Sequence, residues 1–160
     1  MLFRSKFRDF WPGKLIVKSV LSGDQARAAV DAGADAVVVS NHGGRAFDSA
    51  IATIDMLPEI VEAVGDRCTV ILDSGIRRGS DIVKALGLGA KMVLVGRATL
   101  YGTACGGQAG AARAIRILSD EMERSFGYVG ARRVSEIGPH IFAHRDPVMS
   151  VVPVSSREHA

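Results

Sequence analysis

The stretch GADAVVVS at residues 33–40 decides the fold, because a variant of it, GAKMVLVG, recurs at residues 89–96. At the same offset, residues 15–19 (LIVKS) fall on residues 71–75 (ILDSG), so a block of strand, helix and strand occurs twice along the chain. Repetition of strand-helix units at this period favours a closed (β/α)₈ barrel over a doubly wound sheet, because every unit around a barrel is equivalent.

Short apolar runs alternate with amphipathic segments around this repeat. The runs are too short for helices and rich in β-branched residues, which predicts buried strands at residues 15–17, 36–39, 69–72 and 92–95. Helices are predicted between an N-cap at Ser22 and Gly33, and at residues 54–64, 80–88 and 111–126. Strands that are apolar on both faces and alternate with helices predict an α/β fold with a parallel sheet. Four units are half of the eight that close a barrel.

Composition places the chain among ordinary globular proteins. It has 160 residues, 48% hydrophobic and 23% charged, which predicts one packed domain. The net charge of +3 is spread without clustered Lys/Arg runs, which argues against nucleic acid as a partner. The two cysteines, Cys68 and Cys105, form no metal-ligand spacing, so no metal is expected.

The sequence shows neither a secretory signal at its first residues nor a membrane-spanning segment. Residues 1–11 interleave charged and apolar residues, unlike a secretory signal, and no run approaches the ~18 apolar residues of a membrane span. We therefore expect a cytoplasmic protein, with peripheral membrane association of a full-length form left open. The expected organisation is a remnant of a preceding helix or loop at 1–13, the half-barrel at 14–137 and a partly disordered extension at 138–160.

Polar residues directly follow each predicted strand, where a purely structural chain would usually place small turn residues. In barrels of this kind the functional residues lie at the carboxyl ends of the strands. The four places are residues 18–19 (KS), 40–45 (SNHGGR), 73–79 (DSGIRRG) and 96–97 (GR). We expect these four segments to converge on one rim of the sheet.

Glycines and arginines follow the last two strands together. Glycine lets backbone N–H groups approach an oxyanion closely, and arginine neutralises its charge. Either loop alone could equally be an ordinary turn with a surface arginine, but adjacent strand ends in barrels often bind phosphate. The predicted phosphate residues are Gly75, Arg77, Gly79, Gly96 and Arg97, with a helix starting at Ser80.

A histidine and an arginine follow the second predicted strand. The imidazole of His42 can accept a proton near neutral pH, and Arg45 can bind a carboxylate through two parallel hydrogen bonds. The alternative is a loop histidine beside a solvent-exposed arginine, which is the commoner role of such residues. Lys18 is either a strand-end lysine whose charge reaches solvent or the cation that an anionic cofactor needs nearby.

These blocks together resemble the FMN-dependent 2-hydroxy-acid dehydrogenases and oxidases, a family that includes L-lactate dehydrogenase, mandelate dehydrogenase and glycolate oxidase. The resemblance spans about residues 12–137 and rests on residues 15–18 (LIVK), 40–45 (SNHGGR), 73–86 (DSGIRRGSDIVKAL) and 95–97 (VGR), in the family's order. The SNHGGR string is far more specific than a lone glycine pattern. The resemblance implies the C-terminal half of a TIM (β/α)₈ barrel, strands 5 to 8 with their helices.

The resemblance also implies the cofactor and the role of each site residue. FMN would be the cofactor, His42 the active-site base that also contacts substrate, and Arg45 the residue that binds the substrate carboxylate. Lys18 would lie by the N1/O2 edge of the flavin. The implied cofactor-binding residues are Lys18, Ser40, Asp73, Ser74, Gly75, Ile76, Arg77, Gly96 and Arg97.

The implied reaction is FMN-dependent oxidation of an (S)-2-hydroxy acid to the 2-oxo acid. Residues 46–48 (AFD) depart from the family's usual Gln-Leu-Asp, which predicts an altered loop beside the substrate. The family's first four strands have no counterpart here, so activity is expected only within a complete barrel. The substrate among such acids and the electron acceptor stay undefined.

Two other functions compete with this enzyme. One is a truncated, non-catalytic half-barrel that binds phosphate or flavin and associates with itself or with a complementary half through its open sheet edges. The other is a different phosphate-binding barrel, such as a guanine-nucleotide-type dehydrogenase. Residues 42–45 argue against the latter, since they supply a base and a carboxylate clamp and no catalytic cysteine loop is evident.

Overall fold

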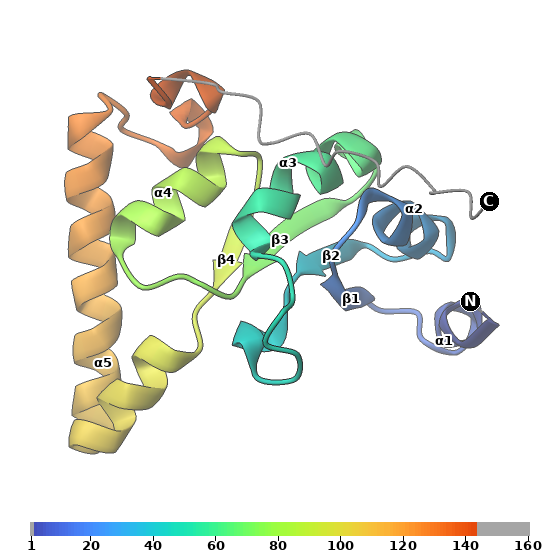
Figure 1. Ribbon diagram of the computed structural model, residues 1–160, viewed down its shortest axis with the longest axis horizontal. Helices are drawn as coiled ribbons and strands as arrows, with labels where there is room; N and C mark the ends of the chain where they lie inside the picture. The colour runs from blue at the N-terminus through green and yellow to red at the C-terminus, as the bar shows by residue number, and fades with distance from the viewer. Residues whose placement is uncertain (1, 144–160) are drawn as a thin grey trace, which may run out of the picture.

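The computed structural model describes residues 2–143 and shows one parallel sheet with helices along the chain between its strands (Figure 1). The strand order β1-β2-β3-β4 follows the chain, and all three neighbouring pairs are parallel. The strands are β1 (Ile16–Val20), β2 (Ala36–Val39), β3 (Thr69–Asp73) and β4 (Met92–Leu94). The predicted parallel, adjacent order of the four strands is confirmed.

Each strand is followed by a helix, as the repeat predicts. The helices are α1 (Leu2–Phe10), α2 (Gly23–Asp31), α3 (Thr53–Val64), α4 (Gly79–Gly87) and α5 (Arg97–Tyr128). The hydroxyl of Ser22 caps α2 by accepting a hydrogen bond from the backbone N–H of Gln25 at 3.2 Å, as expected. The bounds of α2, α3 and α4 agree with the predicted segments to within two residues.

The main core lies between the sheet and helices α2, α3 and α4. The strands contribute alternate valine and leucine side chains, and α3 contributes Leu57 and Ile60, both fully buried. All four residues of β2 are buried, because this strand lies between β1 and β3 and is covered on both faces. A smaller cluster on the opposite, inner face consists of Ala36, Val38 and Ile71 with Leu94 packed against them.

Helix α5 starts earlier than predicted, at Arg97 instead of residue 111. Its first segment has no continuous apolar stripe, which is why periodicity missed it. Two non-helical glycines, Gly106 and Gly107, break the helix so that the first segment turns back towards the second. A side chain on Gly110 would overlap the carbonyl oxygen of Gly102, so this turn requires glycine where the two segments cross.

The sheet is open at both edges. β1 and β4 each pair on one side only, and Ile16 and Met92 on these strands are 52% and 55% exposed. Four parallel βα units with unpaired edge strands are half of a (β/α)₈ barrel, so the predicted fold class is confirmed. The predicted domain bounds stay a prediction, and residues 144–160 of the expected extension lie outside the described chain. No helix among residues 2–143 combines the length and hydrophobicity needed to cross a membrane.

Candidate active site

An open cavity of about 940 Å³ lies at the carboxyl ends of the strands. Ten of the eleven residues to which the family resemblance assigns a catalytic, substrate-binding or cofactor-binding role line it, so the sequence-based expectation that the four strand ends converge is confirmed. These ten are Lys18, His42, Arg45, Asp73, Ser74, Gly75, Ile76, Arg77, Gly96 and Arg97. The eleventh, Ser40, is fully buried behind the cavity and reaches it through its neighbours.

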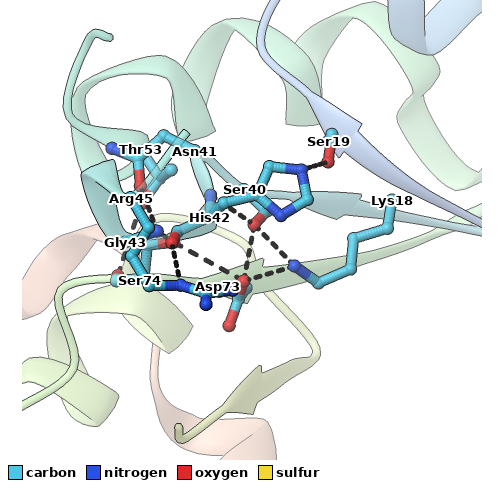
Figure 2. A network of polar contacts seen from close by, with 10 residues as sticks. All are labelled: Lys18, Ser19, Ser40, Asn41, His42, Gly43, Arg45, Thr53, Asp73 and Ser74. Carbon is cyan, nitrogen blue, oxygen red and sulfur yellow. Dashed lines mark hydrogen bonds and ion pairs between the residues drawn. The ribbon is translucent and has the colours of Figure 1, made fainter. Parts of the chain in front are cut away.

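A lysine, a serine and an aspartate form a polar network across β1, β2 and β3 (Figure 2). The Lys18 Nζ donates to Asp73 Oδ2 at 2.7 Å and to Ser40 Oγ at 2.8 Å. The Ser40 hydroxyl in turn donates to Asp73 Oδ2 at 2.5 Å. Partial burial acts to raise the pKa of Asp73, but the hydrogen bonds from Lys18 and Ser40 and the lysine charge outweigh it. The pKa of Asp73 is therefore lowered, and the carboxylate stays ionised opposite the ammonium.

The histidine of the SNHGGR string lies on a tight turn, η1 (His42–Gly44), after β2, and Arg45 follows this turn. Asn41 caps this turn by accepting the N–H of Gly43 through its side-chain oxygen at 2.9 Å. His42 itself has a φ of 57°, in the left-handed region. Its ring nitrogen Nε2 lies 2.7 Å from the hydroxyl of Ser19, and Arg45 Nε donates to the His42 carbonyl at 3.3 Å.

Ser74 joins the histidine turn to the loop after β3. Its hydroxyl accepts the backbone N–H of Gly43 at 3.0 Å, and its carbonyl accepts the hydroxyl of Thr53 at 3.3 Å. Thr53 is 3% exposed and begins helix α3. Sequence reasoning missed both Thr53 and the contact of Ser19 with His42, because neither contact has a local sequence signal. The two loops therefore form one connected rim.

The helix after the DSGIRRG loop is not an open anion site. Asp81 Oδ2 accepts the backbone N–H groups of Arg77 and Arg78 at 3.1 and 3.0 Å. Glu121 Oε2 accepts that of Gly79 at 2.8 Å. The expectation that the backbone N–H of Gly79 helps to bind phosphate is therefore wrong, because this amide already has a carboxylate partner.

The remaining glycines and arginines do fit a phosphate group. Helix α5 begins after Gly96 without a side-chain cap, so its first backbone N–H groups lack a side-chain partner at residues that line the cavity. No atom lies within 4 Å of a Cβ built on Gly75 or Gly96, so a ligand can approach the backbone at both positions. Arg77 and Arg97 form no ion pair within residues 2–143. Their charges are free to neutralise an anion.

The charge of the cavity favours the same kind of ligand. Its lining carries a single carboxylate, that of Asp73, which is already paired with Lys18. The cationic residues of the lining are Lys18, Arg45, Arg77 and Arg97. A site with this excess of positive charge attracts an anionic cofactor and an anionic substrate.

Parallel βα units with a glycine- and arginine-lined cavity at the carboxyl ends of their strands are typical of a (β/α)₈ barrel, here represented by four units. Within this class, residues 5–144 match the profile of a family described as FMN-dependent dehydrogenase. The chain belongs to that family, which is a family of enzymes with FMN as the cofactor.

Known proteins of the family show how much of it this chain covers. It is 51% identical over 126 residues to an L-lactate oxidase of Nostoc sp., covering 79% of this chain and 34% of that protein. It is 46% identical over 140 residues to an L-lactate dehydrogenase of Caulobacter vibrioides, covering 88% of this chain and 37% of that one. The chain thus spans about a third of the length of these relatives.

The structure is also similar to solved members of the family. A soluble mutant of the membrane-associated (S)-mandelate dehydrogenase from Pseudomonas putida superposes with a TM-score of 0.83 at 43% identity. The match covers 86% of this chain and 39% of that one. This relative is described as membrane-associated. The comparisons therefore do not confirm the expected cytoplasmic location, and they are consistent with a peripheral membrane association.

Proposed function

We propose that this chain carries the FMN-phosphate site and the catalytic base of an enzyme that oxidises an (S)-2-hydroxy acid to the 2-oxo acid. The observation that carries the proposal is a single cavity lined by His42, Arg45, Lys18 and the arginines after β3 and β4. The names of the relatives, lactate and mandelate enzymes, support a small 2-hydroxy acid as the substrate class. The electron acceptor stays undefined.

The cofactor set follows from the same cavity. Arg77, Arg97 and the backbone at Gly75 and Gly96 would hold the phosphate of FMN. Asp73, Ser74 and Ile76 lie next to them and would contact the ribityl region, with Ser40 supporting Asp73 from behind. When bound, the flavin supplies an acceptor for the two electrons that leave the substrate.

The substrate would be handled by the histidine turn. Arg45 binds the carboxylate of the hydroxy acid, which places the hydroxyl-bearing carbon near His42. The imidazole of His42 would accept one of the two protons that the substrate loses on oxidation, and the other would leave with the two electrons to the flavin or pass to solvent. Lys18 would hold positive charge beside the flavin, with Asp73 fixing the position of its ammonium group.

We further propose that the chain works within a complete barrel. Both edge strands have unpaired backbone groups, and Ile16 and Met92 lie exposed on them. Four further βα units would pair with these edges and complete the substrate pocket, whether as another part of the same protein or as a partner chain. The isolated chain is expected to show little or no turnover.

A flavin titration tests the phosphate site. Arg97→Ala should weaken FMN binding about 10- to 100-fold and riboflavin binding little, since only FMN carries the phosphate. Fluorescence quenching of each flavin measures both affinities. Arg116→Ala, an exposed arginine elsewhere on α5, is the matched control and should leave both unchanged. Equal losses for FMN and riboflavin would contradict the assignment of Arg97 to phosphate.

The open sheet edges also favour a second candidate, a non-catalytic half-barrel that binds flavin or phosphate and self-associates. This protein would bind FMN through the same arginines but would transfer no electrons from a hydroxy acid. Sedimentation at several protein concentrations measures self-association of the chain. Anaerobic addition of lactate or mandelate to a complete barrel measures electron transfer to the flavin and distinguishes the two candidates. Bleaching of the flavin supports the enzyme, and stable absorbance supports the binding module.

A further inference from the structure

The first part of helix α5 is a separate helical segment that lies at the cavity. Residues 97–105 form this segment, and beyond the break at Gly106 and Gly107 residues 108–128 continue the helix in another direction, as Figure 1 shows. The residues of the segment that line the cavity are Arg97, Ala98, Thr99, Leu100, Tyr101 and Thr103. The position of the segment therefore determines where Arg97 and the N–H groups of the first helical turn lie.

This segment has few supports of its own. None of residues 97–105 is buried. Its side-chain hydrogen bonds within residues 2–143 are local, since Thr99 donates to the carbonyl of Gly96 and Thr103 donates to the carbonyl of Thr99, both at 2.9 Å. Only Val95 and Gly96 connect it to β4, and no atom lies within 4 Å of a Cβ built on Gly96. Because glycine permits many backbone conformations, this link does not fix the direction of the segment.

A close backbone contact joins the segment to the second part of the same helix, at Gly102 and Gly110. A Cβ built on Gly102 would lie 2.5 Å from the carbonyl oxygen of Gly110, and a Cβ built on Gly110 would overlap the carbonyl oxygen of Gly102. The obstructing atoms belong to the backbone, which cannot rotate away as the end of a long side chain can. The two backbones therefore meet directly, and a larger residue at either position would push the two parts of α5 apart.

The second part of α5 is itself held against α4. Glu121 Oε2 accepts the backbone N–H of Gly79 at 2.8 Å, and its Oε1 pairs with Arg78 at 2.9 Å. A Cβ built on Gly79 would lie 2.5 Å from the carbonyl carbon of Glu121, so this contact also leaves no room for a side chain. Two glycine contacts in series thus connect α4 to residues 97–105.

We propose that Gly102 and Gly110 are positioning residues for the phosphate site: their backbone contact fixes residues 97–105 and holds Arg97 at the cavity. The inference rests on the proposed function, in which this end of the cavity binds the phosphate of FMN. Neither glycine is among the residues that line the cavity, so both act through Arg97 and the first turn of α5. The competing explanation is that the glycines only permit the turn and that the link from β4 alone places Arg97.

An alanine at the crossing tests the proposal. Alanine is a better helix former than glycine, so Gly110→Ala displaces the segment without weakening the helix. We expect FMN binding to weaken about tenfold and riboflavin binding to stay unchanged, because the hydrogen bonds from Arg97 to phosphate depend on its position. Gly127→Ala is the matched control in the same helix, because no atom lies within 4 Å of a Cβ built there. Fluorescence titration measures both affinities, and circular dichroism shows whether each variant is folded.

A double-mutant cycle with Arg97→Ala distinguishes positioning from general damage. If Gly110 acts through Arg97, Gly110→Ala should cost little further FMN affinity once the arginine is absent. Equal losses for FMN and riboflavin, full additivity with Arg97→Ala, or unchanged FMN affinity in a folded Gly110→Ala protein would each overturn the positioning role. If Gly110→Ala does not fold, Gly102→Ala, which has the milder overlap, takes its place in the same measurements.

Inorganic phosphate separates this inference from the proposed function. When phosphate is titrated into the ¹⁵N-labelled chain of 160 residues, the backbone amide signals of Arg97 and Ala98 should shift. The midpoint should lie about tenfold higher in Gly110→Ala than in the wild type and Gly127→Ala. That result supports the positioning role even if FMN fails to bind, which would count against the proposed function alone. Equal midpoints, or no shift in the wild type, would overturn the inference and leave the FMN titration to be judged separately.

Discussion

Two aspartates at opposite ends of the sheet have similar partners and different surroundings. Asp35 lies before β2, where it accepts the backbone N–H of Leu15 at 2.8 Å and pairs with Lys14 and Arg8 at 2.9 and 3.1 Å. Asp73 lies at the end of β3, where it pairs with Lys18 beside the cavity. Each carboxylate is ionised and bonded to a lysine, so local chemistry alone does not distinguish them.

Their positions in the barrel do distinguish them. The partners of Asp35 tie the segment after α1 to the amino-terminal end of the sheet, away from the cavity, so its interactions serve stability. The partner of Asp73 lies at the carboxyl end, where barrels of this class carry their ligands. We therefore expect changes at the carboxyl end to affect cofactor binding and reaction, and changes at the amino-terminal end to affect unfolding. The following predictions test this division, from the largest expected effect to the smallest.

The largest effect is expected at the base. In a complete barrel, His42→Gln should slow flavin reduction by a 2-hydroxy acid about 10²- to 10⁴-fold, because the glutamine amide cannot accept the proton. The affinity for FMN should be unchanged, since the phosphate residues are untouched. Stopped-flow absorbance measures the rate and fluorescence titration measures the affinity. Unimpaired reduction would exclude His42 as the base.

The next effect concerns the lysine of the carboxyl end. Lys18→Met removes one of the cations that line the cavity and should weaken FMN binding about tenfold. Hydrogen bonding from Lys18 is the largest cause that lowers the pKa of Asp73, so this pKa should rise in the variant. Carbon-13 NMR of the Asp73 carboxyl carbon follows that change. An unchanged titration would show that Ser40 and the backbone hold the carboxylate by themselves.

Particular residues show how much of the division between the two ends of the sheet the sequence alone predicts. The apolar runs and the polar residues after them predicted the four strands and the cavity lining, because strand ends in a parallel sheet share one edge. The role of Glu121 could not be predicted, since Glu121 reaches Gly79 across 42 residues of sequence. The bulge at Ser19 has no local signal either, because a serine in the left-handed region looks like any other strand residue.

A smaller effect, on stability alone, is expected at the other aspartate. Backbone hydrogen bonding from Leu15, followed by the Lys14 contact, lowers the pKa of Asp35 to about 2. The unfolded chain takes up this proton near pH 4. The contribution of Asp35 is therefore complete above about pH 4 and is lost as the pH falls towards 2.

Asp35→Asn should lower the midpoint of thermal unfolding at pH 7 and leave FMN affinity unchanged. It should also remove part of the acid dependence of the midpoint between pH 4 and 2, because the carboxamide does not titrate. Thermal melts of both proteins, followed by circular dichroism at several pH values, measure both effects. Weaker FMN binding in this variant would show that the two ends of the sheet are coupled.

The smallest effect is expected at Lys14, the counterpart of Lys18 at the amino-terminal end. Its side chain is 84% exposed, and exposed ion pairs contribute little because water and salt screen them. Lys14→Met should leave the unfolding midpoint at pH 7 and the FMN affinity within error of the wild type. Arg8→Met is the matched comparison at the same carboxylate, because Arg8 is 31% exposed and also donates to the carbonyls of Trp11 and Gly13. It should lower the midpoint clearly, and equal midpoints for the two variants would show that hydrogen bonding from Leu15 alone holds Asp35 in place.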